Sequence, residues 1–246
     1  MTDDCSKGTS KGMNRSKDKN TTDELYEYLF RIPKIELHAH LNGCIREETL
    51  FSLAAERGVT LQEAYFKRQG GNGVGGGGGK GLNDDGLLYN TLPRSLSDCF
   101  VMFTEIPKAV NDLPALRRIT REALEDFAEH NTVYLELRST PKRLWRDFRQ
   151  TNQEKGQQQN PVDILATKKE YIETILQVME EFEQEQALED SGRLPMTCRF
   201  LVSVDRSQSV EEAAEHVDLA ISFFCNERNN NNNNKEPRVV GMDLGG

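Results

Sequence analysis

The sequence predicts an α/β fold built on a parallel sheet, and two observations support this prediction. Short apolar runs bounded by turn residues, a pattern typical of buried strands, recur along the chain. Segments with apolar residues at helical spacing lie between these runs, and strands that alternate with helices form βαβ units with parallel strands. Four strands of this kind correspond either to a small open sheet or to half of an eight-stranded barrel, which typically needs about 250 residues.

Four apolar runs are the expected strands: Ile32–Leu41, Thr132–Ser139, Arg199–Asp205 and Val239–Leu244. A helical period precedes each of the last three runs. Its apolar positions are Leu116, Ile119, Ala123 and Phe127, then Leu165, Ile172, Ile175, Met179 and Phe182, and finally Val210, Ala213, Ala214, Val217, Ile221 and Phe224. Ser209 with Glu212 three residues later forms a capping box that opens the last helix. A plain barrel does not need residues 42–130, so we expect a helical insertion after the first strand, near the barrel mouth.

The chain divides into a tail and one domain. Residues 1–22 are rich in Lys, Ser, Asp and Asn, a composition that indicates a disordered polar tail. Residues 23–246 form the expected domain. Two low-complexity stretches within it, the glycine-rich residues 70–81 and the asparagine run 229–234, cannot bury apolar surface and are expected to be surface loops without a function.

Composition excludes several classes of function. The chain has 31 Lys and Arg against 40 Asp and Glu, a formal net charge of −9 that argues against a nucleic-acid partner. Its five cysteines are widely spaced and contain no C-x-x-C pair, which suits a reducing compartment and argues against a disulfide framework. With no apolar stretch typical of a signal peptide or a membrane span, the sequence predicts a soluble cytoplasmic protein without a membrane partner.

The tripeptide His38-Ala39-His40 ends the first expected strand. Side chains alternate along a strand, so the two imidazoles are expected to share one face of the sheet, together with Glu36 and Asn42. Two imidazoles so placed can bind one Zn²⁺ ion, and the alternative is a pair of structural histidines in a polar pocket. Conserved chemistry in α/β barrels lies at the carboxyl ends of strands, which favours the metal site.

Polar residues also follow the second expected strand. Hydroxyls, backbone N–H groups and cations in Ser139-Thr140-Pro141-Lys142 and Arg143 are suited to hold a phosphate. The alternative is an ordinary loop with its cations in solvent. Glu136 and Arg138 share a face of this strand and are expected to pair inside the sheet.

The remaining candidates carry weaker signals. Asp205 ends the third strand, where it orients a substrate hydroxyl or a histidine, or caps a helix. Gly246 follows the fourth strand, and glycine at a strand end lets a ligand approach the backbone. His130 lies at a helix end, where a helix-dipole role is the simpler account. His216 lies within an amphipathic helix and is expected to face solvent, and neither of these two histidines is expected to bind zinc.

Four segments together resemble the adenosine deaminase family. The segment Pro33–Gly43 (PKIELHAHLNG) resembles the opening motif of that family. The segments Tyr134–Pro141 (YLELRSTP), Val204–Arg206 (VDR) and Val240–Leu244 (VGMDL) are similar to its second, third and fourth strand ends. The resemblance runs in order from about residue 23 to the end of the chain. It implies a (β/α)8 TIM barrel of the metal-dependent hydrolase type, of which about the first four strands are present.

The resemblance also implies a subgroup and site residues. Asn42 in place of Asp and the LELRSTP segment are typical of the adenosine-deaminase-like branch, which acts on N6-methyl-AMP. The implied partner is a purine nucleoside monophosphate or a nucleoside, and the implied state is a monomer. The implied zinc ligands are His38 and His40. The implied substrate contacts are His40, Asn42, Ser139, Thr140, Pro141, Lys142, Asp205 and Gly246.

In such an enzyme, a zinc-bound water attacks carbon 6 of the purine and a Glu acts as general acid. The chain departs from the family pattern in two respects. Pro107 follows Cys99–Phe103 where the branch has a substrate-contacting His, so that contact is lost or moved. The family's third zinc histidine, catalytic Glu, second histidine and Asp ligand lie beyond Gly246. We therefore expect no catalytic residue within the chain, no complete active site, and a truncated or fragmentary gene product.

Two rival interpretations remain at this point. One is another zinc amidohydrolase, such as a cyclic-amide hydrolase, because those enzymes share the H-x-H motif of the first strand. The LRSTP and VDR strand ends argue against it. The other is a fragment that has no enzymatic activity.

Overall fold

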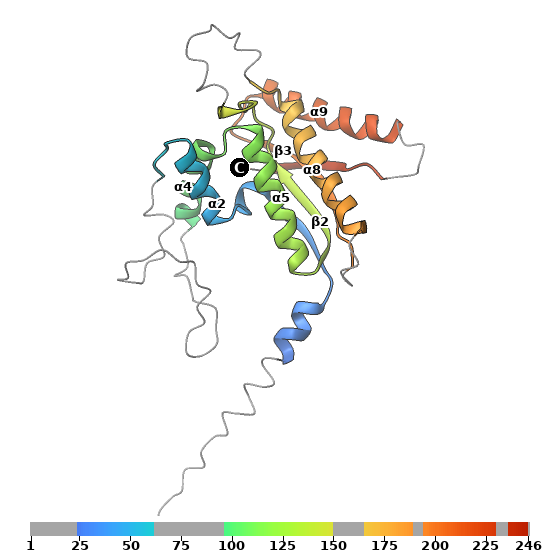
Figure 1. Ribbon diagram of the computed structural model, residues 1–246. Helices are drawn as coiled ribbons and strands as arrows, with labels where there is room; N and C mark the ends of the chain where they lie inside the picture. The colour runs from blue at the N-terminus through green and yellow to red at the C-terminus, as the bar shows by residue number, and fades with distance from the viewer. Residues whose placement is uncertain (1–23, 62–95, 150–164, 189–193, 230–235, 246) are drawn as a thin grey trace, which may run out of the picture.

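The computed structural model describes residues 24–61, 96–149, 165–188, 194–229 and 236–245. Its centre is one parallel sheet in the order β1-β2-β3-β4, which confirms the four expected strands. Their bounds are Lys34–His40 for β1, Thr132–Ser139 for β2, Thr197–Asp205 for β3 and Val239–Gly245 for β4 (Figure 1). Each strand pairs with the next one along the chain, as consecutive strands of a barrel do.

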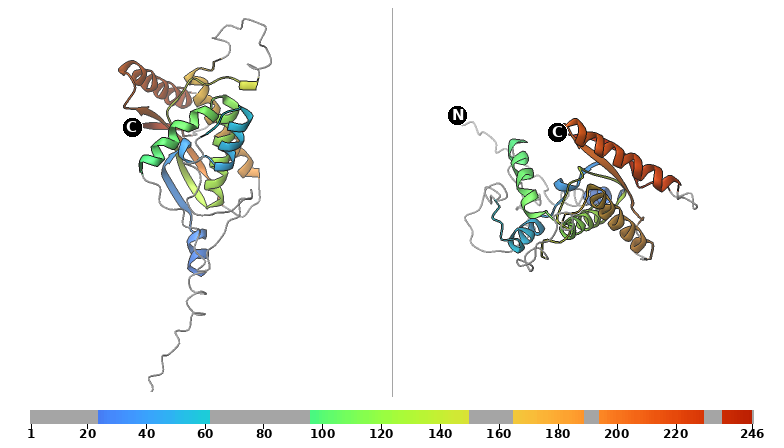
Figure 2. Two further views of the ribbon diagram at one scale, coloured as in Figure 1. Left: turned by 90° about the vertical axis from the view of Figure 1, so that its left-hand side faces the viewer. Right: turned by 90° about the horizontal axis from the view of Figure 1, so that it is seen from above.

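Helices connect the strands and lie along one side of the sheet. They are α2 (Glu47–Glu56), α4 (Leu96–Ala109), α5 (Leu113–Glu129), α8 (Lys168–Leu188) and α9 (Val210–Asn229), with a 3-10 turn η1 at Leu41–Gly43 and a short helix over residues 24–31. Right-handed crossovers between successive parallel strands place every connecting helix on the same side. Seen from above, α5, α8 and α9 form an arc beside the strands (Figure 2). Helices α2 and α4 are the expected insertion after the first strand.

Both ends of α5 follow from local chemistry. Asp112 caps its first turn, where the carboxylate accepts a hydrogen bond from the Ala115 N–H at 2.9 Å. His130 ends the helix as expected, with Nδ1 at 2.8 Å from the Asp126 carbonyl oxygen. Asn131 follows in the left-handed region (φ 63°), which Asn tolerates better than most residues. Its carbonyl accepts from the Lys34 N–H at 2.9 Å, so the end of α5 also fixes the start of β1.

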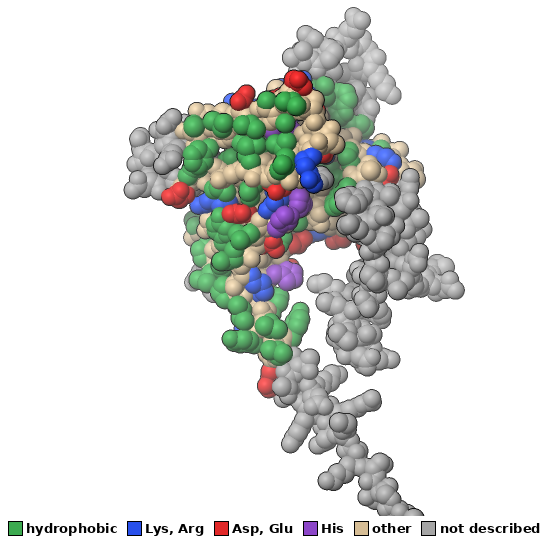
Figure 3. Space-filling model, turned by 180° about the vertical axis from the view of Figure 1, so that it is seen from behind, with side chains coloured by type: hydrophobic (Ala, Val, Ile, Leu, Met, Phe, Trp, Pro, Cys, Tyr) green, Lys and Arg blue, Asp and Glu red, His purple; other side chains and the backbone are tan. Residues whose placement is uncertain are grey.

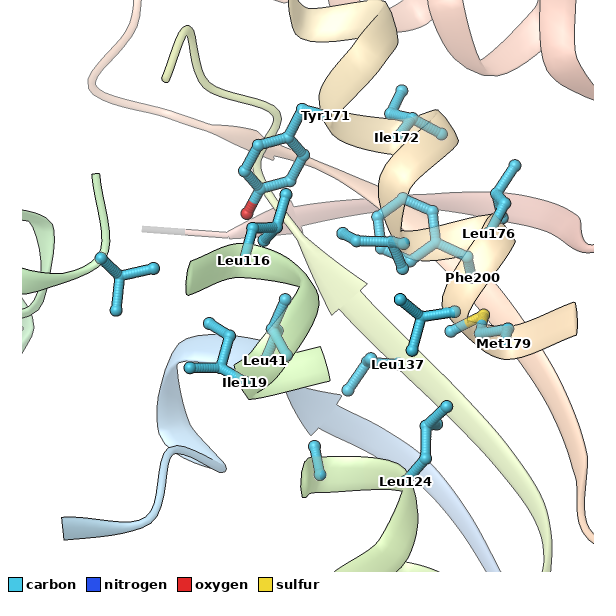
Figure 4. Close-up of a cluster of buried hydrophobic side chains, with 14 of the residues drawn as sticks. Leu41, Leu116, Ile119, Leu124, Leu137, Tyr171, Ile172, Leu176, Met179 and Phe200 are labelled. Carbon is cyan, nitrogen blue, oxygen red and sulfur yellow. The ribbon is translucent and has the colours of Figure 1, made fainter. Parts of the chain in front are cut away.

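The hydrophobic core lies between the sheet and the helices α5 and α8 (Figure 4). Leu137 and Phe200 point from β2 and β3 toward these helices and are completely buried. Facing them are Leu116, Ile119 and Leu124 of α5 and Ile172, Ile175 and Met179 of α8. The helical periods expected for these two helices are therefore confirmed, except that Leu165 precedes α8 and bridges to Trp145.

The predicted orientation of α9 is wrong. Ser209 does cap the helix, with its hydroxyl accepting from the Glu212 N–H at 3.2 Å. However, Val210 is 80 % exposed and Ile221 is 55 % exposed, whereas His216 is completely buried. The buried stripe is His216, Ala220 and Phe223, at helical spacing. The apolar residues of this helix lie around more than half of its circumference, so only the position of the sheet decides which of them are covered.

Both edge strands expose large apolar side chains among the described residues. Ile35 and Leu37 of β1 are 66 % and 53 % exposed, and Leu244 of β4 is 68 % exposed. Viewed from the side opposite to Figure 1, hydrophobic side chains cover much of the described surface, and histidine side chains lie among charged ones (Figure 3). Unpaired edges of this kind occur in open sheets and are removed when a sheet closes into a barrel.

The expected tail 1–22, the loop 70–81 and Gly246 lie outside the described residues. The expected loop 229–234 does so from residue 230 onward, and Asn229 is the last residue of α9. None of the helices in the described part of the chain combines the length and the apolar run needed to cross a bilayer.

Replacing Leu137 with Ala should lower the free energy of unfolding by about 2–5 kcal/mol, because it removes a buried side chain from the centre of the core. Leu188→Ala is the matched control, since Leu188 is 87 % exposed and its loss should change stability by less than about 0.5 kcal/mol. Urea denaturation followed by circular dichroism measures both. Equal effects would show that the core is not where the structure places it.

Candidate active site

The carboxyl ends of the four strands meet at a polar hollow. Its lining comes from η1 and from the ends of β1, β2, β3 and β4, and comprises His40, Leu41, Asn42, Arg138, Ser139, Thr140, Ser203, Asp205, Asp243 and Gly245. Parallel strands bring residues from distant parts of the chain to this edge, which is where α/β barrels carry their chemistry. Five of the eight implied substrate contacts, His40, Asn42, Ser139, Thr140 and Asp205, therefore lie together as expected.

The two imidazoles of the H-x-H motif converge. The Nε2 atoms of His38 and His40 are 3.1 Å apart, and the ring centroids are 5.0 Å apart. Two nitrogens bound to one tetrahedral Zn²⁺ at 2.0–2.1 Å lie about 3.3 Å apart, so the observed spacing fits a shared ion. Partial burial lowers the pKa of His40, and the neighbouring His38 and Arg138 lower it further. The ring is therefore neutral near pH 7, the form that offers a lone pair to a metal.

An irregularity in β1 separates these rings from Glu36. The register against β2 shifts between Glu36 and Ala39, which indicates one extra residue in this part of β1. Glu36 accepts a hydrogen bond from the His38 N–H at 2.8 Å, and so satisfies a backbone donor at the irregularity. The prediction that Glu36 shares a face with the histidines is wrong. Glu36 lines a different hollow, beside Ala123 and Phe127 of α5, because the shift interrupts the alternation.

Arg138 and Asp243, which both line the polar hollow, form an ion pair. Arg138 Nη1 lies 2.8 Å from Asp243 Oδ1, and Nη2 donates to the Leu37 carbonyl at 2.5 Å. The predicted pairing of Arg138 with Glu136 is wrong, since Glu136 accepts instead from the Tyr134 hydroxyl at 2.9 Å. The reason is geometric, because the Arg138 side chain reaches past β3 to a strand that is distant in sequence.

The 139–142 loop, Ser139-Thr140-Pro141-Lys142, begins beside the first turn of α8. The Ser139 hydroxyl lies 2.7 Å from the hydroxyl of buried Tyr171 on α8. Burial lowers the pKa of Lys142, and the Asp205 carboxylate opposes that effect. The Lys142 ammonium is therefore close enough to Asp205, which lines the hollow, to be affected by its charge. Lys142 itself is not part of the lining.

Asp205 has a structural role in addition to its place in the hollow. Its Oδ1 accepts from the Ser207 backbone N–H at 2.8 Å and from the Ser207 hydroxyl at 2.7 Å. These bonds lower the pKa of Asp205, and the Lys142 and Arg206 cations lower it further. The helix-capping alternative is therefore close to what the structure shows, since these bonds shape the turn before α9.

Sequence reasoning missed five residues that line the hollow: Leu41, Gly245 and three with polar side chains, Arg138, Ser203 and Asp243. Ser203 is 4 % exposed, and its hydroxyl has no hydrogen-bond partner among the described residues. A sequence signal was present for two of them, because Ser203 and Asp243 are polar residues within apolar strands. The structure places these two residues side by side in the β3–β4 register. Pro107 lies exposed near the end of α4 and is not part of this lining.

The parallel sheet β1-β2-β3-β4 and its helices have the fold class of a (β/α)8 barrel of the metal-dependent hydrolase type, of which four strands are described. No model of a protein family matches the chain. Its curated relatives include an N6-mAMP deaminase of Arabidopsis thaliana, 32 % identical over 89 % of this chain and 53 % of the relative, and an N6-methyl-AMP deaminase of Homo sapiens, 30 % identical over 89 % and 48 %. The chain spans about half the length of these relatives.

Solved structures agree with the curated relatives. The Arabidopsis N6-mAMP deaminase structure is 32 % identical with a TM-score of 0.59, over 89 % of this chain and 52 % of that one. A structure named Arabidopsis ADAL complexed with IMP is 30 % identical with a TM-score of 0.58, over 89 % and 51 %. The resemblance to the adenosine deaminase family is thereby confirmed, and so is the barrel fold class. Within that family, the relatives described here are named for deaminases of N6-methyl-AMP.

Replacing Ser207 with Ala should raise the pKa of Asp205, because the hydroxyl bond from Ser207 is the largest cause of its lowering. The fold favours the charged carboxylate, so this contribution to stability is present above the unfolded pKa and is lost as the pH falls through the lower folded value. Carboxyl carbon NMR titration measures the shift. Ser222→Ala, a hydroxyl on α9 that bonds to the Leu219 carbonyl, is the control. An unchanged Asp205 midpoint in Ser207→Ala would contradict the assignment.

Proposed function

We propose that this protein is a zinc-dependent hydrolytic deaminase of purine nucleotides, and that it converts N6-methyl-AMP into IMP and methylamine. The observation that carries the proposal is a hollow where His40, whose ring converges with that of His38, lies with the hydroxyls of Ser139 and Thr140. The 32 % identical Arabidopsis relative, named for this activity, supports the choice of reaction. The proposed enzyme belongs to the hydrolases that act on C–N bonds in cyclic amidines.

His38 and His40 would hold the Zn²⁺ ion, which supplies a water of lowered pKa as the nucleophile. A zinc site takes at least three protein ligands. The described residues contain no group of three or more His, Cys, Asp or Glu side chains placed to hold a metal. The third ligand and the general acid would come from strands beyond β4, which the longer relatives have room for.

The nucleotide would lie across the hollow. His40 and Asn42 face the base, and Asp205 orients it or the ribose. The hydroxyls of Ser139 and Thr140, the Pro141 segment and the Lys142 ammonium would receive the phosphate, and the backbone of Gly246 would approach the purine. Lys142 suits this role because its charge is partly desolvated, so an added phosphate dianion interacts with it more strongly than with a cation in water. Related structures named for complexes with IMP and GMP support a nucleotide ligand.

We also propose an oligomeric state and a cellular location for the protein. Residues 23–246 would form one half of a barrel that is monomeric when complete and lies in the cytoplasm. The widely spaced cysteines, without a C-x-x-C pair, support a reducing compartment.

The direct test joins this chain at its last residue to the remaining barrel of the Arabidopsis relative. With Zn²⁺, the product should deaminate N6-methyl-AMP faster than adenosine or a cyclic amide. His38→Ala should lower turnover by more than about 100-fold, because losing a metal ligand should lower activity more than losing a residue that only orients such a ligand. His130→Ala is the control, since that exposed ring lies at the far end of α5. A folded, zinc-loaded product that prefers cyclic amides would favour the rival hydrolase, and one that is inactive on all three would refute the proposal.

Replacing Lys142 with Met should weaken binding of IMP by about tenfold while leaving inosine unchanged, because a single charge-assisted bond contributes about 1.5–3 kcal/mol when buried and less at a partly open site. Calorimetry with the two ligands measures this difference. Arg143→Met is the matched control, because Arg143 is the adjacent, exposed cation. Equal losses for IMP and inosine would show that Lys142 does not face the phosphate.

A further inference from the structure

His216 on α9 is a buried ring that the proposed chemistry does not use. The side chain is completely buried. Neither Nδ1 nor Nε2 has a hydrogen bond of good geometry, although a neutral imidazole carries one N–H donor and one acceptor. A buried polar group without a partner costs about 1–3 kcal/mol, so a ring placed in this way needs an explanation.

The nearest explanation lies in the 139–142 loop. The backbone carbonyl of Pro141 faces the His216 ring closely enough to favour its protonated form. Pro141 is itself buried, and it follows the two residues whose hydroxyls line the hollow. This carbonyl is therefore the acceptor next to the ring that a His216 N–H could use.

Burial is the main reason that the His216 ring is neutral. Burial lowers the pKa of His216, and the Lys168 ammonium on α8 lowers it further, while Glu215 and Glu212 on α9 act in the opposite direction. Lys168 is engaged by Glu215 at 2.8 Å, so it does not compete for the Pro141 carbonyl in the structure. A neutral ring with one N–H next to one carbonyl is matched to a single bond.

We propose that His216 is a positioning residue: its ring N–H donates to the Pro141 carbonyl and so holds the 139–142 loop in the position that receives a phosphate. Tyr171 holds the first residue of the same loop through the Ser139 hydroxyl, at 2.7 Å. The loop is thus supported from α8 at one end and from α9 in its middle. The choice of phosphate as the ligand rests on the proposed function, whereas the support of the loop by His216 does not.

The test compares His216→Phe, which removes the donor, with His216→Asn and His216→Gln, each of which returns an amide N–H at one of the two ring-nitrogen positions. The probes are IMP and inosine, measured by calorimetry on the full chain. His216→Phe should weaken IMP about tenfold, the factor for one net bond of about 1.4 kcal/mol, and leave inosine unchanged. At least one amide variant should restore IMP binding. His130→Phe, the same substitution at an exposed ring, should change neither.

Hydrogen exchange of the segment 140–145, which follows β2, provides the second measurement in the ligand-free protein. In His216→Phe it should be about tenfold faster, while β2 and β3 stay protected and so show that the variant is folded. Equal losses for IMP and inosine, no rescue by either amide, or unchanged exchange of this segment would each overturn the proposal. If the wild-type chain binds neither ligand, the nucleotide proposal fails, and the exchange comparison still decides the role of His216.

Discussion

The site depends on one buried ion pair, between Arg138 of β2 and Asp243 of β4. Their side chains are 7 % and 19 % exposed, and Arg138 also donates to the Leu37 carbonyl of β1. One guanidinium thus ties together three strands whose carboxyl ends form the polar hollow. Burying such a pair is costly, and removing one partner from it typically destabilises a protein by about 3–5 kcal/mol because the other charge is left uncompensated. The pair is better explained by the alignment of the strand ends than by stability.

The two histidines converge because they are alternate residues of β1, and the irregular register of this strand keeps Glu36 away from them. A regular strand would place alternate side chains on one face but would also bring Glu36 beside the rings. The shift between Glu36 and Ala39 separates them, so the carboxylate turns toward α5. Burial lowers the pKa of His40, and its positive neighbour Arg138 lowers it further. Local strand geometry and a charge from a neighbouring strand therefore act together on the His40 ring.

In the described residues, the groups proposed to bind the nucleotide are more complete than the groups proposed to carry out the reaction. Hydroxyls, the Asn42 amide and the His40 imidazole line the hollow at the strand ends, and the His38 ring lies against His40. The relatives are about twice as long, and both edge strands here expose apolar side chains such as Leu37 and Leu244. A barrel that closed between β4 and β1 would cover those edges and enclose the hollow from the other side.

The strands, the helices between them, the H-x-H motif and the polar loop after β2 could all be predicted from the sequence alone. Those features depend on periodicity, turn residues and short motifs, which act over a few neighbouring positions. Only the tertiary structure decided which face of α9 is buried, and with it the burial of His216. It alone paired Arg138 with Asp243 and moved Glu36 away from the histidines. Each of these outcomes depends on contacts between strands and helices far apart in the chain, which local patterns do not encode.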